Sequence, residues 1–160
     1  MLAVTRAPLS VDALAAEVEA SVREHGEGCG AVASFLGVVR ATHQGRAVRY
    51  LEYEAFDALA LKVFAQIQAE AVDRWPSAAL GIAHRVGRLA IGDASIVIIA
   101  ATAHRAEAFQ VCRYAIERVK QIAPVWKHEF FEDGEAWVEG AIVNPDDDAA
   151  RARAMEIACA

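Results

Sequence analysis

Lysine and cysteine are both rare in this chain. Its 160 residues include three lysines against thirteen arginines, and the three cysteines, Cys29, Cys112 and Cys159, are widely spaced and form no CxxC pair. An odd, scattered set of cysteines argues against a disulfide framework and against a structural zinc site. The longest apolar run, 96–101, is too short to span a bilayer, and no signal-peptide pattern begins the chain. We therefore expect a reduced, cytoplasmic protein that does not cross a membrane.

Motifs for metal binding and for nucleophilic catalysis are also missing. No GxSxG motif occurs, Cys112 falls in the apolar repeat of a predicted helix, and Cys29 has no evident base nearby. The glycine-rich segment 26–30 lacks the spacing of a phosphate loop, so we interpret it as a turn. The sequence thus predicts no metal site and no catalytic thiol. No metal-ligand spacing links the five histidines, which are His25, His43, His84, His104 and His128.

The net charge of −6 is unevenly distributed. Residues 104–128 carry five basic and two acidic side chains, whereas residues 129–160 carry two basic and nine acidic ones. A local positive region in an acidic protein suits a small anionic ligand or an anionic peptide end. Duplex nucleic acid needs a broad basic face, so the charge pattern does not predict it as a partner.

Apolar periodicity predicts three helices. Ser10 is expected to cap a helix that ends near residues 25–26, and Asp57 one that runs to about residue 74. A third helix is predicted over 105–122 and stops before Pro124. The apolar face expected on this third helix consists of Phe109, Cys112, Ile116 and Val119.

Several strands are predicted between these helices. The segment 31–39 is expected to pair with 48–55 across a mobile hairpin loop at 40–46, and a second hairpin is expected around Asp133 and Gly134. The other expected strands are 80–86, 95–102, 126–131 and 136–138. Strand pairs interleaved with three helices predict an α+β sheet-and-helix sandwich in a single domain. The tail after Pro145 is expected to form a short helix capped within 146–148, or to be disordered.

Two of the three lysines, Lys120 and Lys127, lie on either side of Pro124. In a chain this rich in arginine, a bare positive charge needs no lysine, whereas a lysine amine can act as acid, base or nucleophile. Pro124 sets the direction in which the chain leaves the helix, so the two amines are expected to converge. Amines held together favour one neutral, reactive lysine. On spacing alone, two ordinary surface lysines remain the alternative.

His104 and Arg105 begin the predicted third helix, where free N–H groups and the helix dipole attract anions. Lys120 lies fifteen residues farther along the chain, about 22 Å away at the helical rise per residue. One small ligand therefore cannot contact both helix ends within one chain. Two separate anion sites would resolve this, and so would one pocket shared by two protomers of a two-fold dimer, which we favour.

Arg40 ends a predicted strand and begins a polar loop, where ligand-facing charges are common. Trp126 and Lys127 are neighbours on another predicted strand, so they point to opposite faces of the sheet. If Trp126 packs inward, Lys127 faces a cleft or solvent.

Six segments follow one another in the order found in a known family. They are Phe35-Leu-Gly-Val-Val-Arg40, Trp75-Pro76, His84-Arg-Val-Gly87, Gly92-Asp93, Ala103-His-Arg105, and Lys120 with Ala123-Pro-Val-Trp-Lys127. Over about residues 3–140 this pattern resembles the large, catalytic subunit of molybdopterin synthase. The resemblance implies an α/β hammerhead fold over residues 1–140, followed by an acidic tail at 141–160.

The resemblance also implies partners and a reaction. Two large subunits would form a homodimer and bind two small ubiquitin-like subunits, giving a heterotetramer. The C-terminal Gly-Gly thiocarboxylate of the small subunit would insert into the large subunit and donate sulfur to cyclic pyranopterin monophosphate. Two such transfers create the dithiolene of molybdopterin. Because the partner supplies the sulfur, no catalytic cysteine and no resident cofactor are expected.

The resemblance assigns Lys120 and Lys127 to proton transfer and to stabilising negative charge on reaction intermediates. His128 follows Lys127 where the family more often has a second basic residue. Arg40, His104 and Arg105 would hold the phosphate or the pterin. Besides the two lysines, the resemblance places these residues at the substrate site: Val38, Val39, Arg40, His104, Arg105, His128 and Glu129.

Two other functional classes remain open from the sequence. A non-enzymatic anion-binding module would explain the positive region but not the use of lysine in place of arginine. A hydrolase or acyltransferase with its own nucleophile would need a Ser/His or Cys/His arrangement, and no such arrangement is evident.

Overall fold

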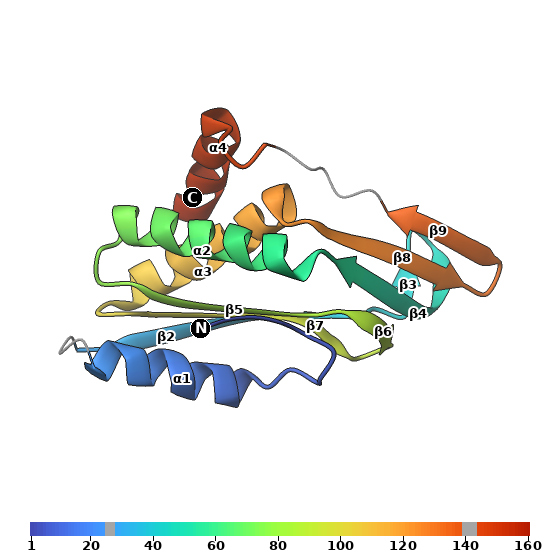
Figure 1. The fold of residues 1–160 in the computed structure, drawn as a ribbon, viewed down its shortest axis with the longest axis horizontal. Coiled ribbons are helices and arrows are strands. Elements are labelled where there is room, and N and C mark those ends of the chain that lie inside the picture. Colours follow the sequence, from blue (N-terminus) through green and yellow to red (C-terminus); the bar gives the residue numbers. More distant parts are fainter. Residues whose placement is uncertain (25–27, 139–143) are drawn as a thin grey trace.

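The structure is a computed structural model that describes residues 1–24, 28–138 and 144–160 (Figure 1). Its helices are α1 (Val11–Glu24), α2 (Asp57–Arg74), α3 (Arg105–Ile122) and α4 (Asp148–Cys159). Its strands are β1 (Leu2–Thr5), β2 (Ala31–Val38), β3 (Thr42–His43), β4 (Arg46–Ala55), β5 (Ala79–Arg85), β6 (Gly87–Ala90), β7 (Ala94–Thr102), β8 (Val125–Phe131) and β9 (Gly134–Val138).

A four-stranded sheet in the order β1-β5-β7-β2 forms the centre of the molecule. In Figure 1, α1 covers one face of this sheet, α2 and α3 cover the other, and α4 lies on the far side of α2 and α3. Apolar side chains form one cluster between the sheet and α1 and a larger one under α2 and α3. Strands β5 and β7 are buried from both sides, which explains their nearly continuous apolar sequences.

A second sheet is built around β4, which pairs with β3, β6 and β8, while β9 completes the β8 edge. The expected pairing of segments 31–39 and 48–55 is therefore wrong, because β2 pairs with β7 and β4 belongs to the other sheet. Segment 40–46 does not form one open loop either. Its residues 42–43 form β3, which folds back on Arg46 and Ala47 through a turn at Gln44 and Gly45.

A side-chain cap begins α1, but neither α2 nor α3 has one. The Ser10 hydroxyl accepts a hydrogen bond from the Ala13 N–H, as expected of the cap of α1. The predicted end of this helix near residues 25–26 lies outside the described residues. Asp57 is not a cap: Phe56 occupies the N-cap position of α2 without a side-chain hydrogen bond, and Asp57 is the first helical residue. Its carboxylate still complements the positive end of the helix dipole.

Helix α3 has the predicted bounds but a different buried face. Cys112, Ile116 and Val119 are buried as expected, whereas Phe109 is 68% exposed. The prediction assumed that polar residues face solvent, but Tyr114 and Arg118 are both fully buried. The helix is therefore turned so that the side of Tyr114 and Arg118 faces inward and Phe109 faces solvent.

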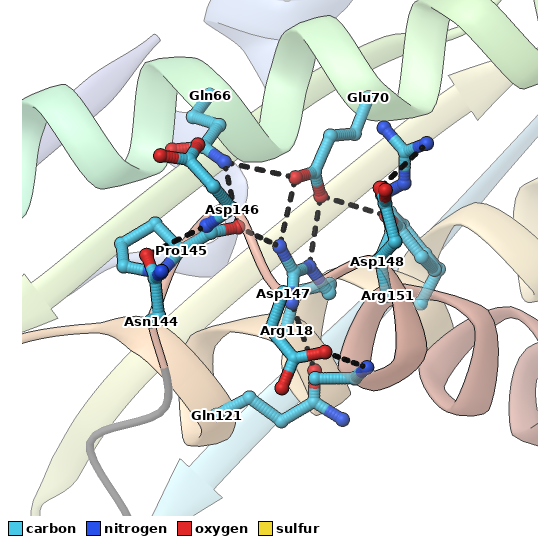
Figure 2. A network of polar contacts seen from close by, with 12 residues as sticks. Gln66, Glu70, Arg118, Gln121, Asn144, Pro145, Asp146, Asp147, Asp148 and Arg151 are labelled. Atoms are coloured by element: carbon cyan, nitrogen blue, oxygen red, sulfur yellow. Dashed lines mark hydrogen bonds and ion pairs between the residues drawn. The ribbon is translucent and has the colours of Figure 1, made fainter.

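Arg118 forms an ion pair that joins α3 to α2 and to the C-terminal segment (Figure 2). Its Nε and Nη2 atoms each donate to a Glu70 carboxylate oxygen at 2.8 Å, and Nη2 also donates to the Pro145 carbonyl at 3.1 Å. The Tyr114 hydroxyl donates to Glu70 Oε2 at 2.7 Å. The guanidinium is thus enclosed by acceptors, which a buried charge requires.

The C-terminal tail contains a helix, as one of the two expectations proposed. The Asp147 carboxylate caps α4 by accepting from the N–H groups of Ala149 and Ala150. Two buried alanines of α4, Ala154 and Ala158, join the larger apolar cluster from the outer side of α3. The α+β class and the single domain are therefore confirmed. In the described part of the chain, no helix combines the length and the apolar character needed to cross a membrane.

Candidate functional site

A cavity of about 590 Å³ opens where the two sheets meet the C-terminal end of α3. A break in strand register between Gly37 and Val38 redirects the end of β2 at this point. Gly37 is packed tightly, since a Cβ atom there would lie 2.6 Å from Ile96 Cγ2. Val38 lines the cavity as a result, whereas Val39 is buried beneath the second sheet.

Two cations reach this cavity without an ion-pair partner among the described residues. Lys120 enters from the last turn of α3, and Arg40 enters from the segment after β2. Both side chains are exposed, so neither charge is cancelled by a fixed carboxylate. The cavity therefore attracts anions through charges that remain available to a ligand.

Lys127 and Glu129 form a connected group on β8. Lys127 Nζ lies 2.6 Å from Glu129 Oε1, and His43 Nδ1 donates to Glu129 Oε2 at 2.5 Å. Glu129 is only 2% exposed. Burial raises the pKa of its carboxyl, but the hydrogen bonds and charges of Lys127 and His43 outweigh burial and hold the pKa below its ordinary value. The ionised carboxylate fixes the position of the Lys127 amine at the cavity.

The lysines around Pro124 thus line one cavity, as their spacing suggested. Alternation along β8 places Lys127 and Glu129 on the cavity side. His128 lies on the opposite face of the sheet, where its ring stacks on Trp137 with centroids 4.3 Å apart. His128 is therefore separated from the other β8 residues expected at the site.

His104 and Arg105 also lie away from this cavity. Both are exposed at the N-terminal end of α3, whereas Lys120 is in its last turn. The two ends of this helix are about 22 Å apart at 1.5 Å per residue. The cavity of one chain thus contains Arg40, Lys120, Lys127 and Glu129 but neither residue of the His104-Arg105 pair.

Five polar residues of the cavity wall were not predicted from the sequence: Thr42, His43, Tyr53, His84 and Ser95. Burial raises the pKa of Tyr53, and the negative charge of Glu129 raises it further, although a hydrogen bond with Ser95 lowers it. The Tyr53 hydroxyl therefore stays protonated. The position of His43 after Arg40 in a polar segment is the only local signal, because its partner Glu129 is 86 residues away. A sequence pattern cannot predict a contact between residues this far apart.

The stability of the fold should fall as pH drops from 6.5 to about 4, with His84 as a cause. Burial lowers the pKa of His84 to about 4 from its ordinary 6.5, although its hydrogen bond with Arg85 acts in the opposite direction. In this pH window the unfolded chain binds a proton that the folded chain does not, which costs on the order of 3 kcal/mol at the acidic end. Urea unfolding at several pH values should show a flatter profile for His84→Gln. The same slope in both proteins would contradict this assignment.

Three comparisons connect this geometry to known proteins. The family model described as MoaE protein matches residues 4–122. The chain belongs to the MoaE family. Its sequence is 50% identical over 109 residues to the molybdopterin synthase catalytic subunit of Halalkalibacterium halodurans, covering 68% of this chain and 70% of that protein.

Solved structures show the same fold. The crystal structure of molybdopterin synthase from Staphylococcus aureus matches with a TM-score of 0.78 and 36% identity, covering 85% of this chain and 95% of that chain. A complex of subunits 1 and 2 of the molybdopterin-converting factor from Helicobacter pylori matches with a TM-score of 0.70 over 88% of this chain and 92% of that chain. At 22% identity this second match supports the fold alone.

The MoaE model covers β2, which leads to Arg40, and the whole of α3, which contains Lys120. Lys127 and Glu129 on β8 lie beyond the matched residues. No group of three or more His, Cys, Asp or Glu side chains arranged to hold a metal ion is present in the described segments.

Proposed function

We propose that this MoaE-family chain is the catalytic subunit of a molybdopterin synthase. In this reaction, sulfur passes from the thiocarboxylated C-terminus of a small ubiquitin-like subunit to cyclic pyranopterin monophosphate and forms the dithiolene of molybdopterin. The observation that carries the proposal is the cavity that holds Arg40 and Lys120, neither paired with a carboxylate of the described residues, beside the Lys127–Glu129–His43 group. Both the phosphate of the substrate and the thiocarboxylate of the donor are anions, and such a cavity attracts both.

The residues of the cavity suit different parts of this reaction. Arg40 presents a planar guanidinium that can bind phosphate oxygens through two parallel hydrogen bonds. Lys120 presents an exposed amine that can transfer a proton or stabilise an oxyanion on the acyl group. Lys127 is held by the buried Glu129 carboxylate and so supplies a positive charge at a defined position. The donor tail brings the sulfur, so this chain needs no nucleophilic thiol. The buried Cys112, whose pKa burial raises to about 11, is poorly suited to be one.

A reconstituted single-turnover reaction tests the proposal. Purified chain would be mixed with cyclic pyranopterin monophosphate and a thiocarboxylated small subunit, and the dithiolene product would be measured. We expect product only when all three components are present. A complex that forms with the small subunit but yields no product would overturn the assignment and leave an anion-binding module.

We also propose that two copies of the chain share each pocket, within a heterotetramer with two small subunits. His104 and Arg105 lie at the other end of α3 from Lys120, so they can complete a substrate site only in a neighbouring copy. A cytoplasmic location is part of the same proposal and is compatible with three free cysteines.

Mixing two inactive variants should restore activity if the pocket is shared. Lys120→Ala removes a residue from one side of the pocket and His104→Ala from the other. A hybrid dimer would then contain one intact pocket, so random exchange should recover about a quarter of wild-type activity. Subunit exchange would be confirmed by mass spectrometry. No recovery after complete exchange would show that the two residues act within one chain or at separate sites.

A further inference from the structure

His84 is a buried histidine in the cavity wall, and the roles proposed above do not use it. It lies on β5, opposite Val4 of β1 and Ile96 of β7, and is 6% exposed. Its ring contacts the Tyr53 ring edge-on, with centroids 5.2 Å apart. A polar ring held this firmly beside a ligand cavity can contribute to recognition.

The hydrogen bonding of His84 defines which ring nitrogen carries the proton. Nδ1 lies 2.9 Å from the Arg85 carbonyl oxygen, which can only accept a hydrogen bond. Nδ1 therefore carries the proton, and Nε2 keeps a free lone pair. The lowered pKa, caused by burial, keeps the ring neutral at pH 7.

Nε2 of His84 borders open space. It has no hydrogen-bond partner among the described residues. In that part of the chain, the only side-chain nitrogen or oxygen that is both closed off from solvent and without a partner is Arg85 Nε, so His84 Nε2 is not closed off. Nε2 is therefore within reach of a solvent-sized molecule, and the space that His84 lines is the cavity. A ligand in this cavity would therefore lie beside His84.

Several other polar side chains of the cavity are already engaged or are cationic, while Thr42 and His43 lie on the more open segment after β2 and are less buried than His84. Each oxygen of the Glu129 carboxylate holds a donor, from Lys127 or from His43. The Tyr53 hydroxyl is hydrogen-bonded with Ser95. Arg40 and Lys120 can only donate when charged. His84 Nε2 is thus a buried side-chain acceptor that stays available to an N–H group of a ligand.

We propose that His84 Nε2 accepts a hydrogen bond from an N–H of the reduced pyrazine ring of the pterin, which makes His84 a specificity-determining residue of the cavity. This inference rests on the proposed function. A neutral imidazole offers one lone pair, which matches a single N–H group. An N–H that finds no acceptor in a buried site loses most of its binding advantage. The cavity would therefore distinguish the reduced ring system from its aromatic oxidation product, whose pyrazine nitrogens carry no hydrogen although the pyrimidinone N–H and the amino group remain.

Binding of two ligands to two variants tests this role. Calorimetry with cyclic pyranopterin monophosphate and with its aromatic oxidation product would use wild type, His84→Phe and His84→Gln. His84→Phe keeps a ring beside Tyr53 but removes the acceptor, so it should weaken binding of the reduced ligand by about tenfold and leave the oxidised ligand unaffected. His84→Gln supplies an amide oxygen and should restore part of the preference.

The wild-type protein offers a second measurement that does not depend on a variant folding. In a ¹⁵N NMR spectrum, the unprotonated Nε2 of His84 should shift upfield when the reduced ligand binds and stay unchanged with the oxidised one. Equal weakening of both ligands in His84→Phe, or an unmoved Nε2 signal with the reduced ligand bound, would overturn the inference while leaving the synthase intact. Wild type that binds neither ligand would overturn the proposed function and this inference together.

Discussion

Replacing Lys120 with arginine should lower the single-turnover rate of dithiolene formation by about a hundredfold or more. Lys120 reaches the cavity from the last turn of α3. Arginine keeps the positive charge, but its guanidinium does not release a proton under physiological conditions, and its planar fork cannot occupy the place of a compact amine. Binding of the anionic substrate should therefore persist while the chemical step fails. Calorimetry and rapid-quench kinetics on the same preparation would separate the two effects.

Lys62 offers a matched control for this substitution. It is the third lysine of the chain, is exposed on α2, and does not line the cavity. Lys62→Arg should leave both the rate and substrate binding unchanged. A near-normal rate in Lys120→Arg would show that Lys120 contributes only charge, and an equal loss in both variants would indicate a general defect.

Replacing Glu70 with glutamine should lower the free energy of unfolding by about 3–5 kcal/mol. Arg118 is 0% exposed, and Glu70 accepts two of its hydrogen bonds (Figure 2). Glu70 also accepts a hydrogen bond from the Tyr114 hydroxyl. Burial raises the pKa of Glu70, but the hydrogen bonds from Arg118 and Tyr114 outweigh burial and hold the pKa below its ordinary value. Without the carboxylate, the buried guanidinium keeps its charge but loses its counter-ion, which is the costly outcome for a buried pair. Urea unfolding at pH 7 measures the loss.

An exposed ion pair provides the comparison for Glu70. Glu19 and Arg23 are one helical turn apart on α1 at 3.9 Å, and both side chains face solvent. Glu19→Gln should cost far less than Glu70→Gln, since solvent screens this pair. Similar losses in the two variants would show that burial of Arg118 is not the source of the effect. Since Arg118 also contacts the Pro145 carbonyl, the Glu70 variant should expose the C-terminal helix to proteolysis first.

Local sequence patterns predicted the helices and much of the site. The proline after α3, the cap at Ser10 and the Asp133-Gly134 turn each act within a few residues, so their consequences can be read along the chain. The same holds for the alternation on β8 that puts Lys127 and Glu129 on one face. The residues themselves pointed to Lys120, Lys127 and Arg40, and the resemblance added Glu129; these four line one cavity.

Residues distant in sequence account for what could not be predicted. β2 pairs with β7, about sixty residues farther along, rather than with the nearer β4, because the chain changes sheets between Arg40 and Thr42. Phe109 is exposed because Tyr114 and Arg118 find Glu70 as a partner on another helix. A polar residue looks solvent-facing in a sequence until a distant partner makes its burial favourable.

The sequence by itself determined where the helices form, the α+β class, the importance of the two lysines around Pro124, and the family to which the chain belongs. The tertiary structure decided which strands pair, which polar groups are buried, and that His43 and His84 stand with the lysines in one cavity. The physical reason is the range of the interactions. Caps, turns and periodicity depend on neighbours along the chain, whereas ion pairs, sheet pairing and burial depend on which distant segments meet.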